Sequence, residues 1–337
     1  MTCLCATHGS LRRAGYHDGM RILILGAGGT GGYFGGRLAQ AGVDVTFLVR
    51  PARAAQLDRD GLRLRSPLGD ADLAVAHVTA DALPALAAQR PFDLVLLSCK
   101  AYDLDSAIEA IAPAVGPDTA VMPILNGLLH YPLLDARFGA DRVLGGLCFI
   151  SAVKGDDGEV VHLPSPPSMT FGERDPARNG SARTRAFEDA CATAVGFDAV
   201  RSDDFLQAAW NKFAFLATLA AATCLMRASI GRIVASDGGA AFLTALHDEC
   251  LVVAADAGHA IPDTAAQQAR ALLTRPESSV TASMLRDLES GQDVEAAQIV
   301  GDMVARARAA SRPAPHLDAA WVHLQCYRSR RATPSTP

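Results

Sequence analysis

The sequence predicts a two-domain protein in which an α/β domain with a parallel sheet precedes an all-helical domain. At 337 residues the chain is long enough for two domains of ordinary size. Apolar strands alternate with helical stretches in the first half, whereas helical periodicity dominates the second half from Ala186 onward. We therefore expect the α/β domain at residues 20–190 and the helical domain at residues 191–330, after an extension at residues 1–19 that we expect to be disordered.

Charge and composition narrow the functional classes. The chain has 31 Lys+Arg against 36 Asp+Glu, a net charge of −5, and no basic block, so neither nucleic acid nor a membrane surface is an expected partner. The longest apolar stretch, residues 213–226, is too short to cross a bilayer. Eight cysteines are too few for a disulfide scaffold, so we expect reduced thiols and a cytoplasmic protein. We expect no metal site, and Cys3 and Cys5 lack partner ligands nearby.

The first predicted elements form a complete βαβ unit. An apolar strand at residues 21–26 runs into a glycine-rich turn, a helix covers residues 33–42, and a second apolar strand covers residues 43–50. In such a turn the first glycine allows a tight bend, the second admits a pyrophosphate, and the third lets helix and strand pack closely. The turn therefore predicts a dinucleotide site of the Rossmann type, formed by Gly26, Ala27, Gly28, Gly29, Thr30 and Gly31.

The residue that ends the second strand indicates which dinucleotide binds. An NAD site usually has Asp or Glu there to bond the ribose 2′-hydroxyl, but this chain has Arg50, with Arg53 close behind and no carboxylate before Asp58. A guanidinium pairs well with a 2′-phosphate. We therefore expect NADPH or NADP as the cofactor. The alternative is that Arg50 is a surface residue at a strand end with no role in binding.

Four further strands and a helix complete the expected α/β domain. Strands are predicted at residues 92–98 and 119–125 with a helix between them, and at 142–153 and 159–163 to close a mixed sheet. Lys100 and Asn126 directly follow the first two of these strands. Ligands bind outside such strand ends in open sheets, so we expect both side chains at the nicotinamide side of the cofactor. A solvated lysine and a simple Asn-Gly turn are the alternatives.

Lysine is rare in this chain, because only Lys100, Lys154 and Lys212 occur among 31 basic residues. Lys154 precedes a hairpin-type turn and is expected to be solvated. Lys212 lies in a helix that is otherwise apolar on nearly every face, where burial would lower its pKa and make it a usable proton donor. Glu295, which enters another helix, is a candidate partner. An exposed lysine and an exposed glutamate fit the sequence equally well.

The chain resembles the ketopantoate reductases (2-dehydropantoate 2-reductases) from Met20 to about residue 328. The matching segments are RILILGAGGTGGYFGG, the strand end at Arg50, SCKAYDL, ILNG, AAWNKF and SMLRDLESGQDVEAAQIVG. The resemblance implies a Rossmann domain joined to a helical domain like the C-terminal domain of 6-phosphogluconate dehydrogenase, with the active site between them. It also implies NADPH-dependent reduction of 2-dehydropantoate to pantoate, on the pathway to pantothenate and coenzyme A. A second copy of the chain is a candidate partner.

The resemblance also assigns roles to single residues. It implies that Lys212 is the general acid, that Glu295 is an active-site glutamate beside the nicotinamide ribose, and that Ser283 binds the substrate carboxylate. Lys100 and Asn126 match residues at the junction of cofactor and substrate. Ala152 aligns loosely with a backbone contact to the cofactor.

Three positions depart from the family pattern. Asparagines that bond substrate oxygens in the family are replaced here by Leu216, Ala220 and, further on, Ile230. Their loss would leave buried oxygens unpaired at about 1–3 kcal/mol each, unless another side chain replaces them. The candidates for that replacement are Thr218, Thr223, Arg227 and Ser229.

The sequence is therefore consistent with three hypotheses about the function. The first is reduction of 2-dehydropantoate, and the second is reduction of a more apolar 2-oxoacid on the same scaffold. The third is a non-catalytic NADP(H) sensor, which would have no need of a proton donor at Lys212. A 3-hydroxyacid dehydrogenase is disfavoured by Arg50 and by the segment around Glu295.

Overall fold

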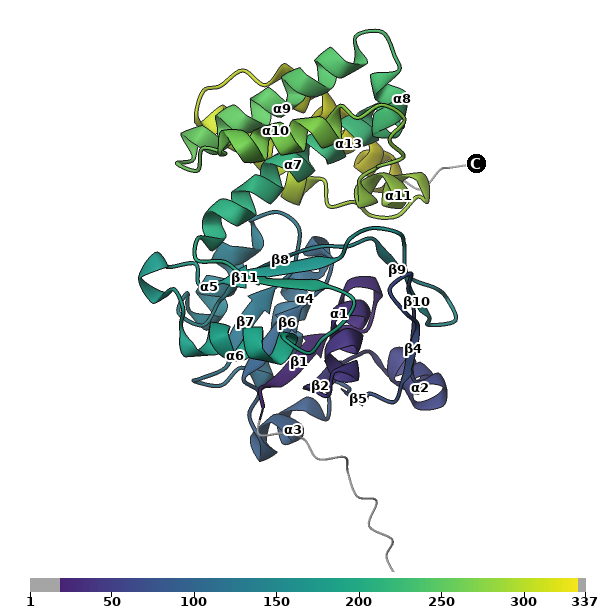
Figure 1. The fold of residues 1–337 in the computed structure, drawn as a ribbon, viewed down its shortest axis with the longest axis vertical. Coiled ribbons are helices and arrows are strands. Elements are labelled where there is room, and N and C mark those ends of the chain that lie inside the picture. The colour runs from purple at the N-terminus through teal and green to yellow at the C-terminus, as the bar shows by residue number, and fades with distance from the viewer. Residues whose placement is uncertain (1–18, 333–337) are drawn as a thin grey trace, which may run out of the picture.

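The structure, a computed structural model, describes residues 19–332 and consists of an α/β half and a helical half joined by the long helix α7 (Figure 1). The predicted extension at residues 1–19, with Cys3 and Cys5, lies outside the described residues except for Gly19. The elements of the α/β half are β1 (Arg21–Leu25), α1 (Gly29–Gln40), β2 (Asp44–Leu48), α2 (Pro51–Asp60), β3 (Leu62–Arg65), β4 (Ala71–Leu73), β5 (Ala76–Val78), α3 (Leu83–Gln89), β6 (Leu94–Leu97), η1 (Ala101–Asp103), α4 (Leu104–Ile111), η2 (Ala112–Ala114), β7 (Ala120–Pro123), α5 (His130–Phe138), β8 (Gly145–Phe149), β9 (Ala152–Lys154), β10 (Val160–His162), β11 (Ser168–Gly172), η3 (Pro176–Arg178), α6 (Ala182–Cys191) and β12 (Asp198–Arg201).

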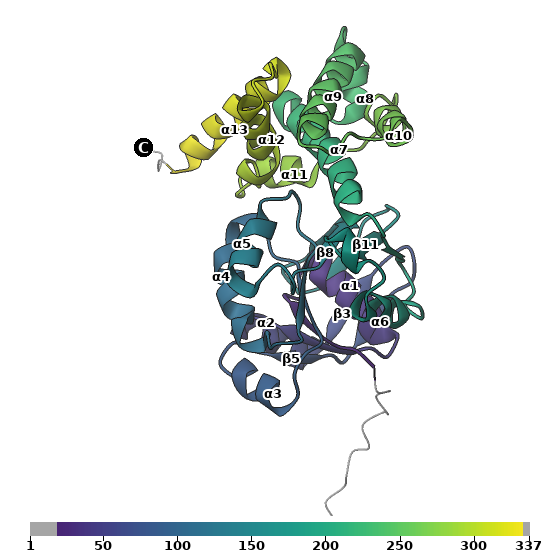
Figure 2. The ribbon, with the colours of Figure 1, turned by 90° about the vertical axis from the view of Figure 1, so that its left-hand side faces the viewer.

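The main sheet is parallel throughout and has the strand order β5-β2-β1-β6-β7. Apart from the edge strand β5, its strands are buried on both faces, because α4 and α5 lie on one side and α1 and α6 on the other (Figure 2). The strand order reverses between β1 and β6. Ligands bind at such a switch point, so the loops after these two strands mark the expected site.

The prediction of one long strand at residues 142–153 closing a mixed sheet is wrong. The segment forms two strands in two smaller sheets, because β8 pairs with β11 and β9 pairs with β10. A single bridge between Val121 and Val143 links this segment to the main sheet. After Phe149 the chain leaves β8 and crosses above the glycine turn, which brings β9 to the expected cofactor side.

The helical half comprises α7 (Phe205–Met226), α8 (Ile230–Val234), α9 (Gly239–Asp256), α10 (Asp263–Leu273), α11 (Ser283–Glu289), the π-helical turn η4 (Ala297–Gly301), α12 (Asp302–Ala309) and α13 (Pro315–Ala332). Asp204 caps α7 by accepting a hydrogen bond from the Gln207 amide. Helix α7 is long and apolar enough to span a membrane, but 72% of its most apolar window is buried within the protein, as in a core helix. The other helices pack around it.

The expectation of helices throughout the chain after Ala186 fails at one place, since β12 follows α6 and pairs in parallel with β11. A sequence of four residues between turns carries too little periodicity to identify this strand. Because β12 belongs to a sheet of the first half, we propose that the α/β domain extends to about residue 201 and that the helical domain begins with α7.

Candidate active site

The glycine turn after β1 has the geometry that a dinucleotide site requires. Gly26 has φ +89°, a left-handed conformation that favours glycine. Gly28 caps α1 with open space around the position of a side chain. A Cβ on Gly31 would lie 2.2 Å from the Ser98 Oγ and 2.6 Å from the Gly26 carbonyl oxygen, so α1 packs directly on the strands. Thr30 and Ala27 lie in the same turn, at the N-terminal end of α1.

Substitution of Gly31 and of Gly28 by alanine is expected to have different effects on stability. Gly31→Ala is expected to lower the free energy of unfolding by about 1–3 kcal/mol, because its methyl group overpacks the contact with Ser98. Gly28→Ala is expected to change stability by less than about 0.5 kcal/mol while weakening dinucleotide binding, because its methyl group faces open space at the helix N-terminus. Urea unfolding and a binding titration separate the two effects. Equal stability of the two variants would contradict this description of the turn.

Ala152 on β9 lies directly above the glycine turn. A Cβ on Gly29 would be 2.5 Å from the Ala152 carbonyl oxygen, so the two backbones touch. Ala152 is therefore next to the glycine turn, and its backbone contact with the cofactor stays a prediction.

Arg50 and Arg53 begin α2, beside the turn. Arg50 is exposed and caps the helix, whereas Arg53 is partly buried and donates from Nε to the Ala27 carbonyl oxygen at 3.1 Å. Its Nη1 donates to Gln56, and its Nη2 is buried with no partner in the described structure. Burial lowers the pKa of Arg53. A buried guanidinium nitrogen without a partner, next to the glycine turn, is suited to an anionic group of a bound dinucleotide.

Lys212 faces the boundary between the two halves. Its Nζ donates to the Cys148 carbonyl oxygen at 2.7 Å and to the Asn126 Oδ1 at 3.1 Å, so a residue of α7 reaches the ends of β7 and β8. The side chain is buried, and this burial lowers the pKa of Lys212, although the negative charge of Glu295 acts in the opposite direction. The sequence left a surface lysine equally open, and the structure places the ammonium in the interior.

Glu295 completes a chain of hydrogen bonds with Asn126 and Lys212. Its Oε1 accepts from the Ala101 amide at 3.0 Å, and its Oε2 accepts from the Asn126 Nδ2 at 3.5 Å. The carboxylate is buried, and the π-helical turn η4 follows almost immediately in the chain. Asn126 therefore lies between a carboxylate and an ammonium from the other half, with its oxygen toward Lys212.

Lys100 lies beside this network but bonds a different carboxylate, because its Nζ is 2.7 Å from the Asp287 Oδ2 of α11. Ser283 is the first residue of α11, one turn before Asp287, and none of the hydrogen bonds described above involves its hydroxyl. The predicted residues Lys212, Asn126, Glu295 and Lys100 are thus brought together across the two halves. Among the described residues no hydrogen bond or ion pair joins them to Arg50, which precedes α2.

The three positions that depart from the family pattern have different environments. Leu216 is partly buried and lines a small cavity together with Lys212. Ala220 and Ile230 are fully buried in the core of the helical half. Thr218 and Thr223 do not compensate, because their hydroxyls donate to the carbonyl oxygens of Ala214 and Leu219 within α7.

Two residues near the site were not predicted from the sequence. Asp287 is one of several charged residues on a short helix, and no pattern distinguishes it from its neighbours. Phe149 ends β8 with 41% of its surface exposed, and its ring centroid lies 5.3 Å from the Lys212 Nζ. An aromatic side chain at the end of an apolar strand is ordinarily a core residue, so its exposure beside a lysine could not be predicted. No metal-binding cluster of His, Cys, Asp or Glu occurs among residues 19–332.

A parallel sheet with a glycine turn at its switch point, facing a lysine and a glutamate of a helical domain, defines an oxidoreductase of the nicotinamide-dinucleotide class. Comparison with known families specifies this further. Residues 22–176 match the model of ketopantoate reductase PanE/ApbA, and residues 204–327 match the model of its C-terminal domain. The chain belongs to the ketopantoate reductase family, as its sequence predicts.

Individual relatives agree with the family assignment. The chain is 34% identical over 312 residues to the uncharacterized oxidoreductase YkpB of Bacillus subtilis, covering 93% of this chain and all of the relative. A 2-dehydropantoate 2-reductase from Geobacter metallireducens has a similar structure, with a TM-score of 0.80, 27% identity and coverage of 91% and 99% of the two chains. A D-mandelate dehydrogenase bound to NADH and anilino(oxo)acetate shares the fold, with a TM-score of 0.81 at 18% identity and coverage of 93% and 100%.

Proposed function

We propose that the protein is an NADPH-dependent reductase of a 2-oxoacid, in which Lys212 donates a proton to the carbonyl oxygen of the substrate. The observation that carries this proposal is the position of Lys212, a buried ammonium held at the carboxyl edge of the sheet by Cys148 and Asn126. An ammonium has three N–H donors, and these two acceptors leave one for a substrate oxygen. Because burial lowers its pKa, the ammonium gives up that proton near neutral pH more readily than an exposed lysine would.

Other residues orient the substrate and keep Lys212 in place. Glu295 fixes Asn126 and the Ala101 amide, which prevents Asn126 from turning its oxygen away from Lys212. We assign the substrate carboxylate to Ser283 and Lys100, which enter from opposite halves. NADPH, when bound, supplies the hydride for C2 of the substrate. Gly26, Gly28, Gly29 and Gly31 at the helix N-terminus, with Ala152 above them, would hold its pyrophosphate.

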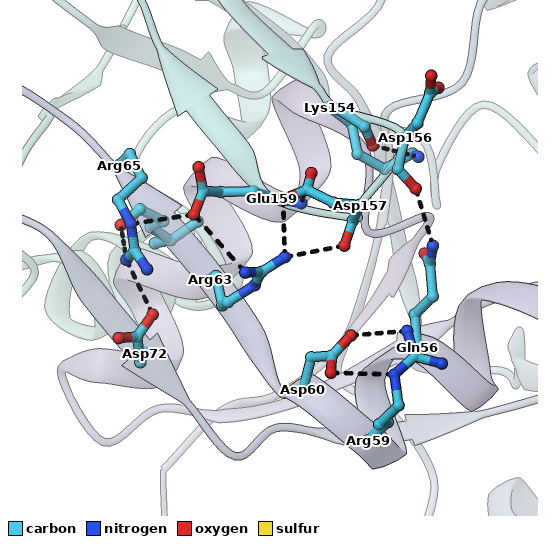
Figure 3. Close-up of polar contacts among 12 residues, drawn as sticks. Gln56, Arg59, Asp60, Arg63, Arg65, Asp72, Lys154, Asp156, Asp157 and Glu159 are labelled. Atoms are coloured by element: carbon cyan, nitrogen blue, oxygen red, sulfur yellow. Dashed lines mark hydrogen bonds and ion pairs between the residues drawn. The ribbon is translucent and has the colours of Figure 1, made fainter.

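Charge around α2 supports NADPH rather than NADH. Three arginines of this region form ion pairs with carboxylates (Figure 3). These ion pairs are Arg59–Asp60, Arg63–Asp157, Arg65–Asp72, and the pairs of Arg63 and Arg65 with Glu159. Arg50 and Arg53 form no ion pair among the described residues. Two arginines without an ion pair at the ribose end of the site favour a 2′-phosphate.

The first candidate substrate is 2-dehydropantoate, which the family membership supports. Its reduction to pantoate would place the protein on the route to pantothenate and coenzyme A. We infer a cytoplasmic location, because every cysteine in the described part of the chain is free. A homodimer stays a proposal that size-exclusion chromatography with light scattering would test.

The second candidate is a 2-oxoacid with a more apolar side chain, and Phe149 favours it. The exposed ring lies against the ammonium of Lys212, so it would contact whatever group is attached to the reacting carbonyl carbon. Leu216, one turn after Lys212, adds a second apolar side chain where family members have an asparagine. A hydroxylated substrate such as 2-dehydropantoate would leave an oxygen unpaired against these groups.

These two candidates are distinguished by a substrate panel and one substitution. The panel compares kcat/KM for 2-dehydropantoate, 4-methyl-2-oxopentanoate and phenylglyoxylate with NADPH. Leu216→Asn is expected to lower KM for 2-dehydropantoate by about ten-fold, the value of one hydrogen bond to a buried oxygen. It should not improve the apolar substrates. A wild-type enzyme that is most efficient with 2-dehydropantoate would remove the second candidate, and failure on all three substrates would refute the proposed function.

A further inference from the structure

Asp287 forms a bond between the two halves that the reaction described above does not use. Its Oδ2 accepts from the Lys100 Nζ at 2.7 Å, and the two side chains are 26% and 40% exposed. Lys100 follows β6 at the switch point of the sheet, whereas Asp287 lies on α11 of the helical half. The bond therefore fixes the position of α11 relative to the edge of the sheet.

Among residues 19–332 this is the only ion pair that connects the two halves. Every other ion pair in this range joins groups of the same half. Most of those pairs lie at the surface, where ion pairs contribute little to stability. The Lys100–Asp287 pair instead lies at the boundary of the two halves, next to the hydrogen bond between Glu295 and Ala101. Its position is therefore not that of an ordinary surface ion pair.

The Lys100 ammonium keeps its charge and retains free donors in this arrangement. Burial alone would lower the pKa of Lys100, but the charge of Glu295 and the bond to Asp287 outweigh it and raise the pKa above its ordinary value. Asp287 occupies one of three N–H donors. Ser283 lies one helical turn before Asp287, so both residues face the same side of α11.

We propose that Asp287 is a positioning residue that holds the Lys100 ammonium where its remaining N–H groups bind the carboxylate of the 2-oxoacid. This role rests on the proposed function. A lysine is a compact charge on a flexible stem, so without Asp287 its ammonium would occupy many positions. The negative charge of Asp287 repels an anionic substrate. The fixed position of the Lys100 ammonium outweighs this repulsion, because small misplacements of a binding group greatly reduce the rate.

Replacement of Asp287 tests this role through the separate kinetic constants. Asp287→Asn is expected to raise KM for the preferred 2-oxoacid about ten-fold, to change kcat by less than about three-fold, and to leave the Kd for NADPH unchanged in a fluorescence titration. Asp287→Glu keeps the charge and should recover part of the loss. Asp256→Asn is the matched control, because Asp256 is 22% exposed and pairs with Arg312 within the helical half. It should behave as wild type.

A double-mutant cycle with Lys100→Met shows whether Asp287 acts through Lys100. In that background Asp287→Asn is expected to change KM by less than about two-fold. Independent, multiplying effects would overturn the proposal, and so would a lowered KM in the single variant or an effect confined to NADPH affinity. Wild-type enzyme that reduces no 2-oxoacid would instead refute the proposed function, and the role of Asp287 with it.

Discussion

Replacing Lys212 by alanine is expected to lower kcat by about 10²–10⁴-fold, the usual contribution of a positioned proton donor. The ammonium is buried and bonded to Cys148 and Asn126, so its loss removes the donor without disturbing the dinucleotide site around the glycine turn. The Kd for NADPH should therefore change little. Steady-state kinetics with the preferred 2-oxoacid and a fluorescence titration of NADPH measure the two quantities.

Lys212→Arg is the sharper variant, because it keeps the positive charge. Guanidinium holds its proton too firmly to act as a donor, so kcat should not recover. In the wild type, kcat for reduction is expected to fall as pH rises through the pKa of Lys212, which burial lowers, since the neutral amine has no proton to give in this direction. Near-normal turnover by either variant would exclude Lys212 as the proton donor.

The second large effect is expected in the choice of cofactor. Arg50→Asp should reduce the preference for NADPH over NADH by about 10- to 100-fold, because it removes a charge-assisted bond to the 2′-phosphate and adds a repulsive charge. Arg53→Gln should reduce it as well, since the buried Nη2 has no other partner. Equilibrium titrations with NADPH, NADH and 2′-phosphoadenosine compounds measure this preference without turnover.

Arg59→Gln is the matched control, because Arg59 lies on the same helix and is paired with Asp60. It should leave the preference unchanged. An unaltered preference in the Arg50 variant, together with a loss in the Arg53 variant, would move the recognition of the 2′-phosphate to Arg53 alone. No change in either variant would contradict recognition of the 2′-phosphate by these two arginines.

The parts of the fold that the sequence predicted well are those in which local pattern and tertiary environment agree. The βαβ unit around Gly26 was readable because an unbroken apolar strand, a glycine turn and a helix follow one another in the chain. The separation of β8 from β9 could not be predicted from the sequence. Between Arg142 and Ser151 the segment has no charged or polar side chain, and nothing in such a run shows where a strand leaves one sheet for another.

The candidate site residues that the sequence predicted are those at strand ends and those of a rare residue type. Lys100 and Asn126 follow apolar strands of the main sheet. Lys212 is one of only three lysines in the chain and lies in an apolar helix. Asp287 could not be found in this way, because its partner is 187 positions away in the sequence and Arg286 and Glu289 flank it on the same short helix. The burial of Ala220 and Ile230 in the helical core likewise depends on packing between helices that are distant in sequence.

The most direct test of the central claim follows the transferred hydrogen. The enzyme is incubated with NADPH that carries deuterium in both positions at C4 of the nicotinamide and with each 2-oxoacid of the panel. The product is analysed by mass spectrometry and NMR. A 2-oxoacid reductase with this site should yield a 2-hydroxyacid with one deuterium at C2 for each NADPH consumed. Tight binding of NADPH with no deuterium transferred to any 2-oxoacid would contradict the account and identify the protein as a binding module.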